Sequence, residues 1–298
     1  MQVSLLVSFL MLTGKTAAYF LTGSAAIFSD AAESVIHLLA TAFVGFSLWY
    51  SFRPADPDHP YGHGKIAYFS SGFEGSMILF AALTIIYTAV RDLVEGPELQ
   101  RLGLGLWMIA GLGGVNLLLG LYLMRTGKRH NNLVLVANGR HVLTDMWTSA
   151  GVVAGVALVW ATGVVWIDPV VAILMALNIT WTAFTLLRQS YQGLMEKADE
   201  QLTAALLGVL EQARARGLVS QFHQVRHRRV ADRVWVEYHL LFPQDLSITE
   251  AHRRSHEVED AVAALFPDDD VTVTAHLEPD TPEVHHARGH AEPADPLG

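Results

Sequence analysis

Six long apolar stretches constrain this chain more than any other feature, because each is long enough to cross a lipid bilayer. The hydrocarbon core of a membrane needs roughly 20 consecutive apolar residues in a helix. The stretches are residues 2–22, 27–52, 67–94, 102–124, 133–162 and 165–188. Segments rich in Gly, Pro and polar residues separate them. The sequence therefore predicts six transmembrane helices. The first is interpreted as a span and not a signal peptide, because it lacks a basic N-terminal region.

The charged residues divide the chain into two parts. Residues 1–192 balance their acidic and basic side chains, whereas residues 193–298 hold 19 of the 29 acidic residues and so carry the whole net charge of −9. Nine of the 14 histidines also lie in this second part. Its acidity argues against nucleic acid as a partner. With no cysteine in the chain, disulfides and thiolate metal sites are excluded.

Residues 193–279 have the pattern of a small α+β domain. The periodicity predicts helices over 199–215 and 247–265 and strands over 219–229, 233–242 and 271–278. The order αββαβ favours a ferredoxin-like fold with helices on one face of a sheet. Residues 280–298 lack periodicity and are predicted to be a disordered tail. Its histidines are expected to be weak metal contacts or to bind nothing: His285, His286 and His290.

Basic residues in the short loops predict the orientation of the helices. The loops after the second and fourth helices hold most of them: Arg53, Lys65, Arg125, Lys128 and Arg129. Loops rich in Lys and Arg stay on the cytoplasmic side. We therefore expect a multi-pass protein of the cell (inner) membrane, in contact with lipid, with both termini in the cytoplasm.

Ionisable residues lie in pairs inside two of the predicted membrane helices. The second helix holds Glu33 and His37, and the fifth holds His141 and Asp145. Each charge at bilayer depth costs roughly 3 kcal/mol unless it faces the protein interior or a cavity. A spacing of four residues puts both members of a pair on one helical face. Two such faces supply two imidazoles and two carboxylates, which suit a tetrahedral Zn²⁺ site. A hydrogen-bonded clamp between helices is the alternative, and Asp30 is a weaker candidate ligand, a helix cap or an entry residue.

Two further clusters lie outside the spans. The loop "RPADPDHPYGHGK" gathers Asp56, Asp58, His59 and His63 within eight residues, although an ordinary polar loop has a similar composition. In the α+β domain, strand alternation puts His276 and Glu278 on one face. Histidines on three neighbouring elements are candidates to join them, or they are merely exposed: His223, His239 and His252.

Together these segments resemble the cation diffusion facilitator family of divalent-metal exporters over nearly the whole chain. The resemblance rests on "GSAAIFSDAAES", "RPADPDHPYGHGK", "ANGRHVLTD", "IDP" and "AHLEP", in that order. It implies a homodimer of six-helix protomers that exchange metal ions for protons. It also implies that the transport ligands are Glu33, His37, His141 and Asp145. The second helix departs from the family pattern, because Glu33 and His37 stand where Asp or His and then Asp are usual.

The resemblance implies roles for the other clusters too. A loop metal site would use Asp56, His59 and His63. A regulatory site at the dimer interface of the cytoplasmic domain would use His223, His239, His252, His276 and Glu278. Lys65 and Glu196 match positions that form a charge interlock in the family.

The sequence thus predicts an exporter that loads metal from the cytoplasm by alternating access and releases it against protons, and not an enzyme. Zn²⁺ is the expected ion, with Fe²⁺, Co²⁺, Cd²⁺ and Mn²⁺ as alternatives. An intramembrane metallohydrolase is one rival, but the chain has no His-Glu-x-x-His signature. A passive metal channel and a metal sensor are the others.

Overall fold

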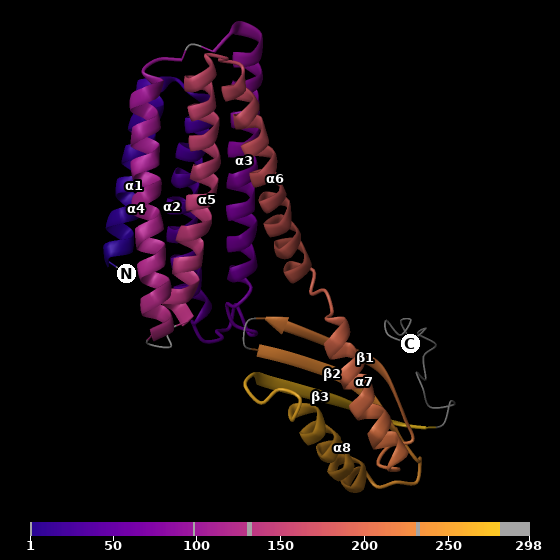
Figure 1. Ribbon diagram of the computed structural model, residues 1–298. Helices are drawn as coiled ribbons and strands as arrows, with labels where there is room; N and C mark the ends of the chain where they lie inside the picture. Colours follow the sequence, from indigo (N-terminus) through magenta and orange to yellow (C-terminus); the bar gives the residue numbers. More distant parts are fainter. Residues whose placement is uncertain (1, 98, 130–132, 231–232, 281–298) are drawn as a thin grey trace. The chain divides into compact units, whose positions relative to one another are not determined.

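The computed structural model describes residues 2–97, 99–129, 133–230 and 233–280 (Figure 1). Almost all of the predicted disordered tail, with its three histidines, lies outside the described residues.

The chain divides into two compact units. The helical unit comprises Met1–Tyr50 and Ile66–Ser190, and the α+β unit comprises Ser51–Lys65 and Tyr191–Gly298. The loop between the second and third helices therefore groups with the α+β unit, although it connects two helices of the other unit.

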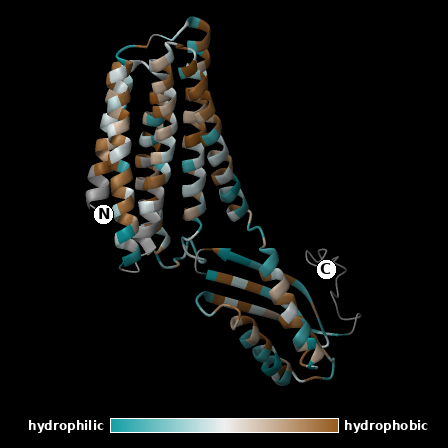
Figure 2. Ribbon diagram, in the orientation of Figure 1, coloured by the Kyte–Doolittle hydropathy of each residue, from teal (hydrophilic) through white to brown (hydrophobic). Residues whose placement is uncertain are grey.

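The six predicted helices are present, close to their predicted bounds. They are α1 (Gln2–Thr22), α2 (Ala25–Ser51), α3 (Ile66–Glu95), α4 (Leu102–Arg129), α5 (Leu133–Thr162) and α6 (Ile167–Leu194). Apolar residues dominate them (Figure 2), and among the described residues α2 to α6 contain segments long and apolar enough to cross a membrane. Helix α4 extends past its predicted end because Lys128 and Arg129 fit in its last turn, where basic groups interact favourably with free carbonyls.

Helix α2 takes part in two buried clusters of the helical unit. Ala25 and Ile36 belong to one cluster with residues of α3 and α6. Ala26 and Ile27 belong to the other, with residues of α1, α4 and α5. A helix buried on two sides can direct polar side chains into protein instead of lipid. This position is what the predicted metal pair on α2 requires.

The N-terminus of α2 is capped by a side chain from α6. Asp168 is fully buried, and it accepts hydrogen bonds from Ser24 Oγ at 2.5 Å and from the Ala25 N–H at 2.7 Å. The first N–H groups of a helix have no partner within the helix, and an acidic group there is favoured by the helix dipole. The "IDP" segment therefore fixes the start of α2 against the start of α6.

The α+β unit has the predicted order of elements. They are α7 (Glu200–Ala215), β1 (Gln221–Val230), β2 (Arg233–Phe242), α8 (Ile248–Ala263) and β3 (Asp270–Pro279). The sheet order is β1-β2-β3, with β1 and β2 antiparallel and β2 and β3 parallel. Ser247 caps α8 by accepting a hydrogen bond from the Glu250 N–H. The Glu250 carboxylate accepts hydrogen bonds from Arg253 and Arg254.

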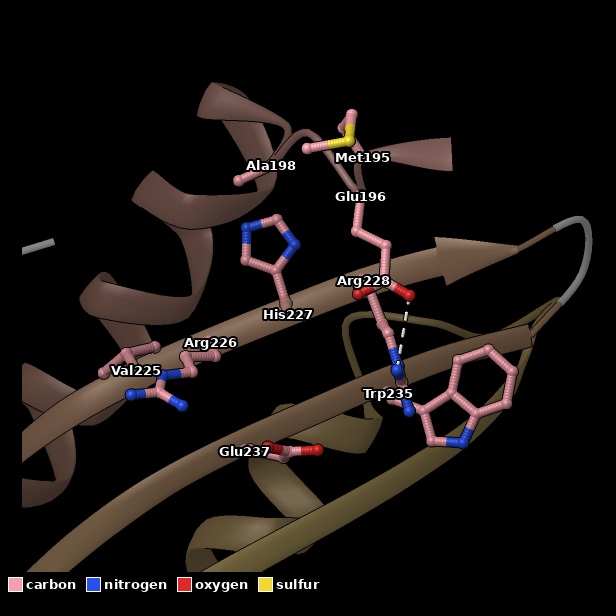
Figure 3. A pocket seen from close by; sticks show the side chains of 9 residues that line it. All are labelled: Met195, Glu196, Ala198, Val225, Arg226, His227, Arg228, Trp235 and Glu237. Carbon is pink, nitrogen blue, oxygen red and sulfur yellow. Dashed lines mark hydrogen bonds and ion pairs between the residues drawn. The ribbon is translucent and has the colours of Figure 1, made fainter. Parts of the chain in front are cut away.

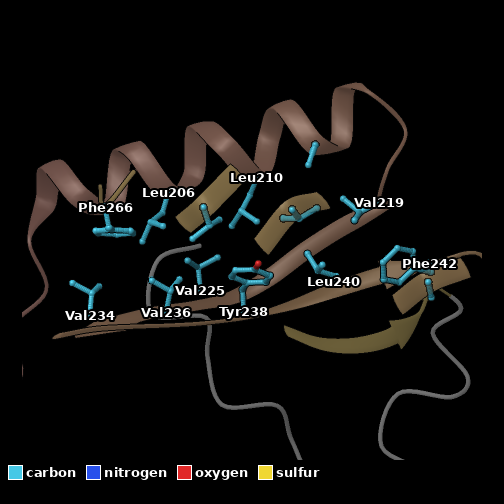
Figure 4. Close-up of a cluster of buried hydrophobic side chains, with 14 residues drawn as sticks. Leu206, Leu210, Val219, Val225, Val234, Val236, Tyr238, Leu240, Phe242 and Phe266 are labelled. Carbon is cyan, nitrogen blue, oxygen red and sulfur yellow. The ribbon is translucent and has the colours of Figure 1, made fainter. Parts of the chain in front are cut away.

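Both helices cover one face of this sheet (Figure 4). Val234, Val236, Tyr238 and Leu240 of β2 are buried against them, as the alternation of apolar residues predicts. The residues between them, including His239, therefore belong to the opposite face. The helices stabilise one face of the sheet and leave the other for polar groups.

Candidate metal sites

Asp30 lies at a buried junction of three helices. Lys15 Nζ of α1 and Ser149 Oγ of α5 each lie 2.8 Å from Oδ1 of Asp30 on α2. The side chains of Lys15 and Asp30 are 4% and 0% exposed. Breaking a buried ion pair leaves an unpaired charge, which is costly. Asp30 is therefore a clamp between helices, a role different from the cap or entry residue suggested by the sequence.

The hydrogen bond between Ser149 and Asp30 sets the register of α2 against α5. The two helices run in opposite directions (Figure 1). Along α2, Glu33 and His37 follow Asp30 on the same face; along α5, Asp145 and His141 precede Ser149 on the same face. A helix rises 1.5 Å per residue, so Glu33 lies about 4.5 Å from Asp30 along the axis of α2, and Asp145 lies about 6 Å from Ser149 along the axis of α5. Because the helices are antiparallel, both displacements run in the same direction.

The backbone therefore places the four predicted transport ligands at two adjacent levels. The backbone position of Glu33 is at about the same depth in the helical unit as that of Asp145, and the position of His37 is at about the same depth as that of His141. Glu33 and Asp145 are half-buried. Sequence reasoning missed Lys15, although a lone lysine in an apolar span is itself a signal of a buried partner.

The loop cluster forms as predicted. Imidazole nitrogens of His59 and His63 lie 3.1 Å and 3.4 Å from the two carboxylate oxygens of Asp56. Asp56 also accepts hydrogen bonds from the N–H groups of Asp58 and His59, which close the turn. Burial opposes ionisation of Asp56, but the hydrogen bond from the His59 N–H and the neighbouring imidazoles outweigh it and lower its pKa. Two imidazoles and an ionised carboxylate are suitable ligands for a divalent metal.

The sheet cluster forms around Glu278. His223, His239 and His276 are aligned across the three strands, each opposite the next. Glu278 is buried, and its carboxylate oxygens lie 3.1 Å from His223 Nε2, 2.8 Å from His239 Nδ1 and 3.4 Å from His276 Nε2. Burial lowers the pKa of His239, which favours the neutral imidazole that a metal binds. The predicted residues of this face are therefore brought together.

A β-bulge explains how His223 joins this face. The register between β1 and β2 shifts between His223 and Arg226, and Gln224 has a φ of +53°. One extra residue on β1 changes which side chains face the helices. Val225 is consequently buried in the core, while His223 stays on the metal-binding face. Sequence alternation alone does not predict this bulge.

His252 does not lie in the sheet cluster of the same chain. It is exposed on α8, the helix that covers the opposite face of the sheet. Its Nε2 lies 3.1 Å from Nε2 of His256. Within a single chain His252 therefore lies apart from the sheet cluster, because strand residues and helix residues face different sides of the sheet, and its place in the predicted dimer-interface site stays a prediction.

The predicted pair of Lys65 and Glu196 is present, and both residues belong to the α+β unit. Lys65 Nζ lies 2.7 Å from Glu196 Oε1, and Arg228 Nη1 lies 3.3 Å from the same oxygen. The hydrogen bond from Lys65, assisted by Arg228, lowers the pKa of Glu196. The Arg228 guanidinium also stacks 4.5 Å from Tyr61 and 5.1 Å from Trp235. The sequence pattern did not indicate Arg228, a residue of strand β1 whose guanidinium group is the second cation beside Glu196.

A cavity of about 410 Å³ opens beside this interlock (Figure 3). It is lined by Met195, Glu196, Ala198, Val225, Arg226, His227, Arg228, Trp235 and Glu237. Its charged residues are already paired in part, since Arg228 reaches Glu196 across it. The predicted metal ligands lie outside its lining.

Two family models match the chain. One, described as the cation efflux transmembrane domain, covers residues 1–195, and the other, described as the cation efflux protein cytoplasmic domain, covers residues 208–280. The chain belongs to the cation efflux family. It is thus a cation diffusion facilitator, as its motifs predict.

Known proteins of this kind align over most of the chain. An uncharacterized transporter of Synechocystis is 35% identical over 89% of this chain and 84% of its own length. The cation-efflux pump FieF of Shewanella oneidensis is 27% identical over 93% of this chain and 92% of its own. A solved structure of CzrB in its zinc form is 30% identical over 28% of this chain and 92% of its own, with a TM-score of 0.26.

Membership of the cation efflux family makes the chain a membrane transporter of cations. The family consists of transporters and not enzymes, so the intramembrane metallohydrolase is ruled out as the function. The apolar helices α2 to α6 agree with a membrane location.

Proposed function

We propose that this cation efflux transporter exports Zn²⁺ through Glu33, His37, His141 and Asp145, in exchange for protons. The observation that carries the proposal is the hydrogen bond from Ser149 Oγ to Asp30 Oδ1. It supports a register in which the four positions share one face between α2 and α5. The buried positions of Asp30 and Ser149 indicate that this face looks into the protein.

The donor set favours Zn²⁺ among the candidate ions. Two imidazoles and two carboxylates are the nitrogen and oxygen ligands that zinc accepts in a tetrahedral site. Fe²⁺, Co²⁺, Cd²⁺ and Mn²⁺ are the alternatives, since ligand type alone separates these ions weakly. The unusual pair on α2, Glu33 with His37, is where we expect the preference to be set.

Exchange for protons follows from the chemistry of the ligands. Imidazole and carboxylate bind a metal only when deprotonated, so protons and metal compete for the same site. Imidazole is the side chain whose free pKa lies nearest to neutral pH, which makes the two predicted histidine ligands the groups that we expect to exchange metal for protons. We propose that rocking of the helices exposes the site to either side in turn. The loops rich in basic residues support cytoplasmic loading and cytoplasmic termini.

The loop and sheet clusters are proposed as regulatory metal sites. The sheet cluster offers Glu278 with two imidazoles within 3.1 Å of it, and the loop cluster offers Asp56 with two more. We propose that the transporter is a homodimer and that metal in the sheet cluster favours the paired state, which couples cytoplasmic metal to transport.

The proposal is tested by uptake of Zn²⁺ into proteoliposomes with an imposed pH gradient. We expect His141→Ala to abolish the flux, because it removes one of two imidazoles from the transport site. The matched control is Glu95→Gln, which changes an exposed ionisable residue of α3 and should leave the flux unchanged. Equal transport by His141→Ala and the parent would show that the proposed site is wrong.

The same vesicles separate an exchanger from a channel. An exchanger requires the pH gradient to accumulate Zn²⁺. Because protons leave the lumen as Zn²⁺ enters, the lumen should become more alkaline in proportion to the metal moved. Flux that is independent of the gradient would favour a passive channel, and metal binding without flux would favour a sensor.

The ion is identified by competition among the five metals for transport, on the parent and on His37→Asp. Replacing an imidazole by a carboxylate makes the donor set harder, so we expect the preference to shift from Zn²⁺ towards Mn²⁺. An unchanged order of preference would indicate that His37 is not a ligand.

A further inference from the structure

The cavity beside the pair of Lys65 and Glu196 begins at the residue that follows α6. Met195 is the first residue after this helix, and it lines the cavity. The last turn of α6, which starts at Tyr191, belongs to the α+β unit. Two backbone hydrogen bonds join the segments, because the N–H of Met195 donates to the carbonyl of Tyr191 at 2.9 Å and the N–H of Lys197 donates to that of Gln192 at 2.9 Å. The cavity is therefore held at the end of α6.

The length of α6 brings this end to the level of lipid headgroups. The helix has 28 residues, so it is about 42 Å long at 1.5 Å per residue. A bilayer is about 40–45 Å thick with its headgroup regions, of which the hydrocarbon core takes about 30 Å. Tyr191 in the last turn and Tyr61, whose ring packs on Arg228, are both exposed. Tyrosine is enriched at membrane interfaces, which agrees with a cavity that opens among headgroups.

The basic groups of the cavity are only partly neutralised. Arg226 Nη2 donates to the neutral Gln224 Oε1 at 2.8 Å, which leaves its charge uncompensated. On the other side of the cavity Arg228 shares the Glu196 carboxylate with Lys65 (Figure 3). Arg226 and Arg228 are two residues apart on β1, so they face the same side of the sheet. Guanidinium groups match the oxygens of a phosphate, and the two arginines therefore favour a phosphate between them.

A carboxylate lies opposite the first of these arginines. Glu237 of β2 is the cross-strand partner of Arg226 and also lines the cavity. Among the described residues neither Arg226 nor Glu237 has an ion-pair partner. A negative side chain beside the phosphate position opposes a purely anionic ligand, but it accepts strong hydrogen bonds from an ammonium group. The cavity thus offers both charges that a zwitterionic ligand needs.

We propose that this cavity binds the phosphoethanolamine headgroup of a membrane phospholipid, with Arg226 and Arg228 on the phosphate and Glu237 on the ammonium. Its volume of about 410 Å³ is within the usual size of small-ligand sites. The Arg228 guanidinium is already held against Tyr61 and Trp235, 4.5 Å and 5.1 Å from their ring centres. Little side-chain ordering is therefore needed on binding.

The test is native mass spectrometry of the purified full-length protein in detergent, titrated with three lipids that have identical acyl chains. Phosphatidylethanolamine has the proposed headgroup, phosphatidylcholine keeps the phosphate but has no N–H on its ammonium, and phosphatidylglycerol has no ammonium. We expect the parent to bind the first roughly tenfold more tightly than the other two, because each of them loses a charge-assisted hydrogen bond to Glu237. Equal binding of the three lipids would contradict the proposal.

Two variants of exposed residues separate the phosphate contact from the ammonium contact. Arg226→Gln should weaken binding of phosphatidylethanolamine and phosphatidylcholine alike, by roughly tenfold, because both carry the phosphate. Glu237→Gln should weaken only phosphatidylethanolamine, down to the level of phosphatidylcholine. The matched controls are Arg216→Gln, at the C-cap of α7, and Glu257→Gln, on α8; both residues are exposed, and both variants should bind as the parent does.

A competition experiment separates the lipid from a soluble source of the same headgroup. Glycerophosphoethanolamine has the phosphate and the ammonium but no acyl chains, so we expect it to displace the lipid only at a far higher concentration. Displacement at equal concentration would show that the ligand does not come from the membrane. The proposal is also overturned if Arg226→Gln matches its control, if Glu237→Gln keeps the preference for phosphatidylethanolamine, or if phosphatidylglycerol binds most tightly.

Discussion

Tyr238 places a hydroxyl group inside the core of the α+β unit (Figure 4). Among the described residues this hydroxyl has no hydrogen-bond partner. Burial raises the pKa of Tyr238 above its ordinary value, so the group stays neutral. An unsatisfied buried polar group lowers the free energy of unfolding by about 1–3 kcal/mol. At position 238 tyrosine is therefore not the residue that gives the most stable fold.

We therefore predict that Tyr238→Phe increases the free energy of unfolding of the α+β unit by about 1 kcal/mol. The ring and its packing are kept, and only the unsatisfied hydroxyl is lost. The control, Tyr238→Ala, should lower the same free energy by about 3–5 kcal/mol because it opens a cavity. Chemical unfolding measures both, and a clear loss of stability in Tyr238→Phe would show that the hydroxyl has a stabilising partner.

His227 gives the α+β unit a dependence on pH. Its Nε2 lies 2.8 Å from Thr203 Oγ1, and burial lowers its pKa below the ordinary value of 6.5, against the opposing charge of Asp199. The unfolded chain thus binds this proton at a higher pH than the folded one. Stability should be fully present above pH 6.5 and should fall as the pH drops below it.

We predict that His227→Gln flattens the fall in melting temperature of the α+β unit between pH 7 and pH 5, about the range in which this histidine titrates. Glutamine is uncharged and keeps a polar group near Thr203. If the parent and the variant lose stability in parallel over this range, another group is responsible.

Single residues also show what sequence can predict. Strand alternation was sufficient to place His276 and Glu278 on one face, because each strand has a period of two residues. It was insufficient for His223, since the bulge at Gln224 depends on how β1 packs against the helices. A positive φ at a residue other than Gly has no reliable local signal.

At the scale of elements, one carboxylate joins three helices. Asp30 is 15 residues from Lys15 and 119 residues from Ser149 in sequence. Apolar length predicts that α1, α2 and α5 exist, because the bilayer fixes the length of a span. It does not predict which helices are neighbours. The periodicity of the sequence therefore does not predict the ion pair between Lys15 and Asp30, although each of the two charged residues stands out in its apolar span.

We predict that Asp30→Asn and Lys15→Met each reduce the stability of the helical unit by about 3–5 kcal/mol, because each leaves an unpaired charge or an unpaired donor in a buried position. The double variant should be less destabilised than the sum of the two, since it removes both charges together. Thermal unfolding in detergent measures all three. Additive losses would mean that the two residues do not interact.

In the whole molecule, the buried hydrogen bond between Ser149 and Asp30 supports the proposed transport site. The sequence predicts the ligand pairs on α2 and α5 from their spacing of four residues. It does not predict that the two pairs are level with each other, because that depends on the contact between Asp30 and Ser149. The α+β unit contributes a separate cluster around Glu278, whose proposed role is regulatory.

We propose that metal crosses the membrane through the site between α2 and α5 and not through the sheet cluster. The most direct measurement is the maximal rate of Zn²⁺ flux into proteoliposomes under a pH gradient, for Asp145→Ala and for His239→Ala. We predict that Asp145→Ala abolishes the maximal rate, whereas His239→Ala keeps it and changes only its dependence on Zn²⁺ concentration. Normal flux in Asp145→Ala, together with loss of flux in His239→Ala, would contradict the claim.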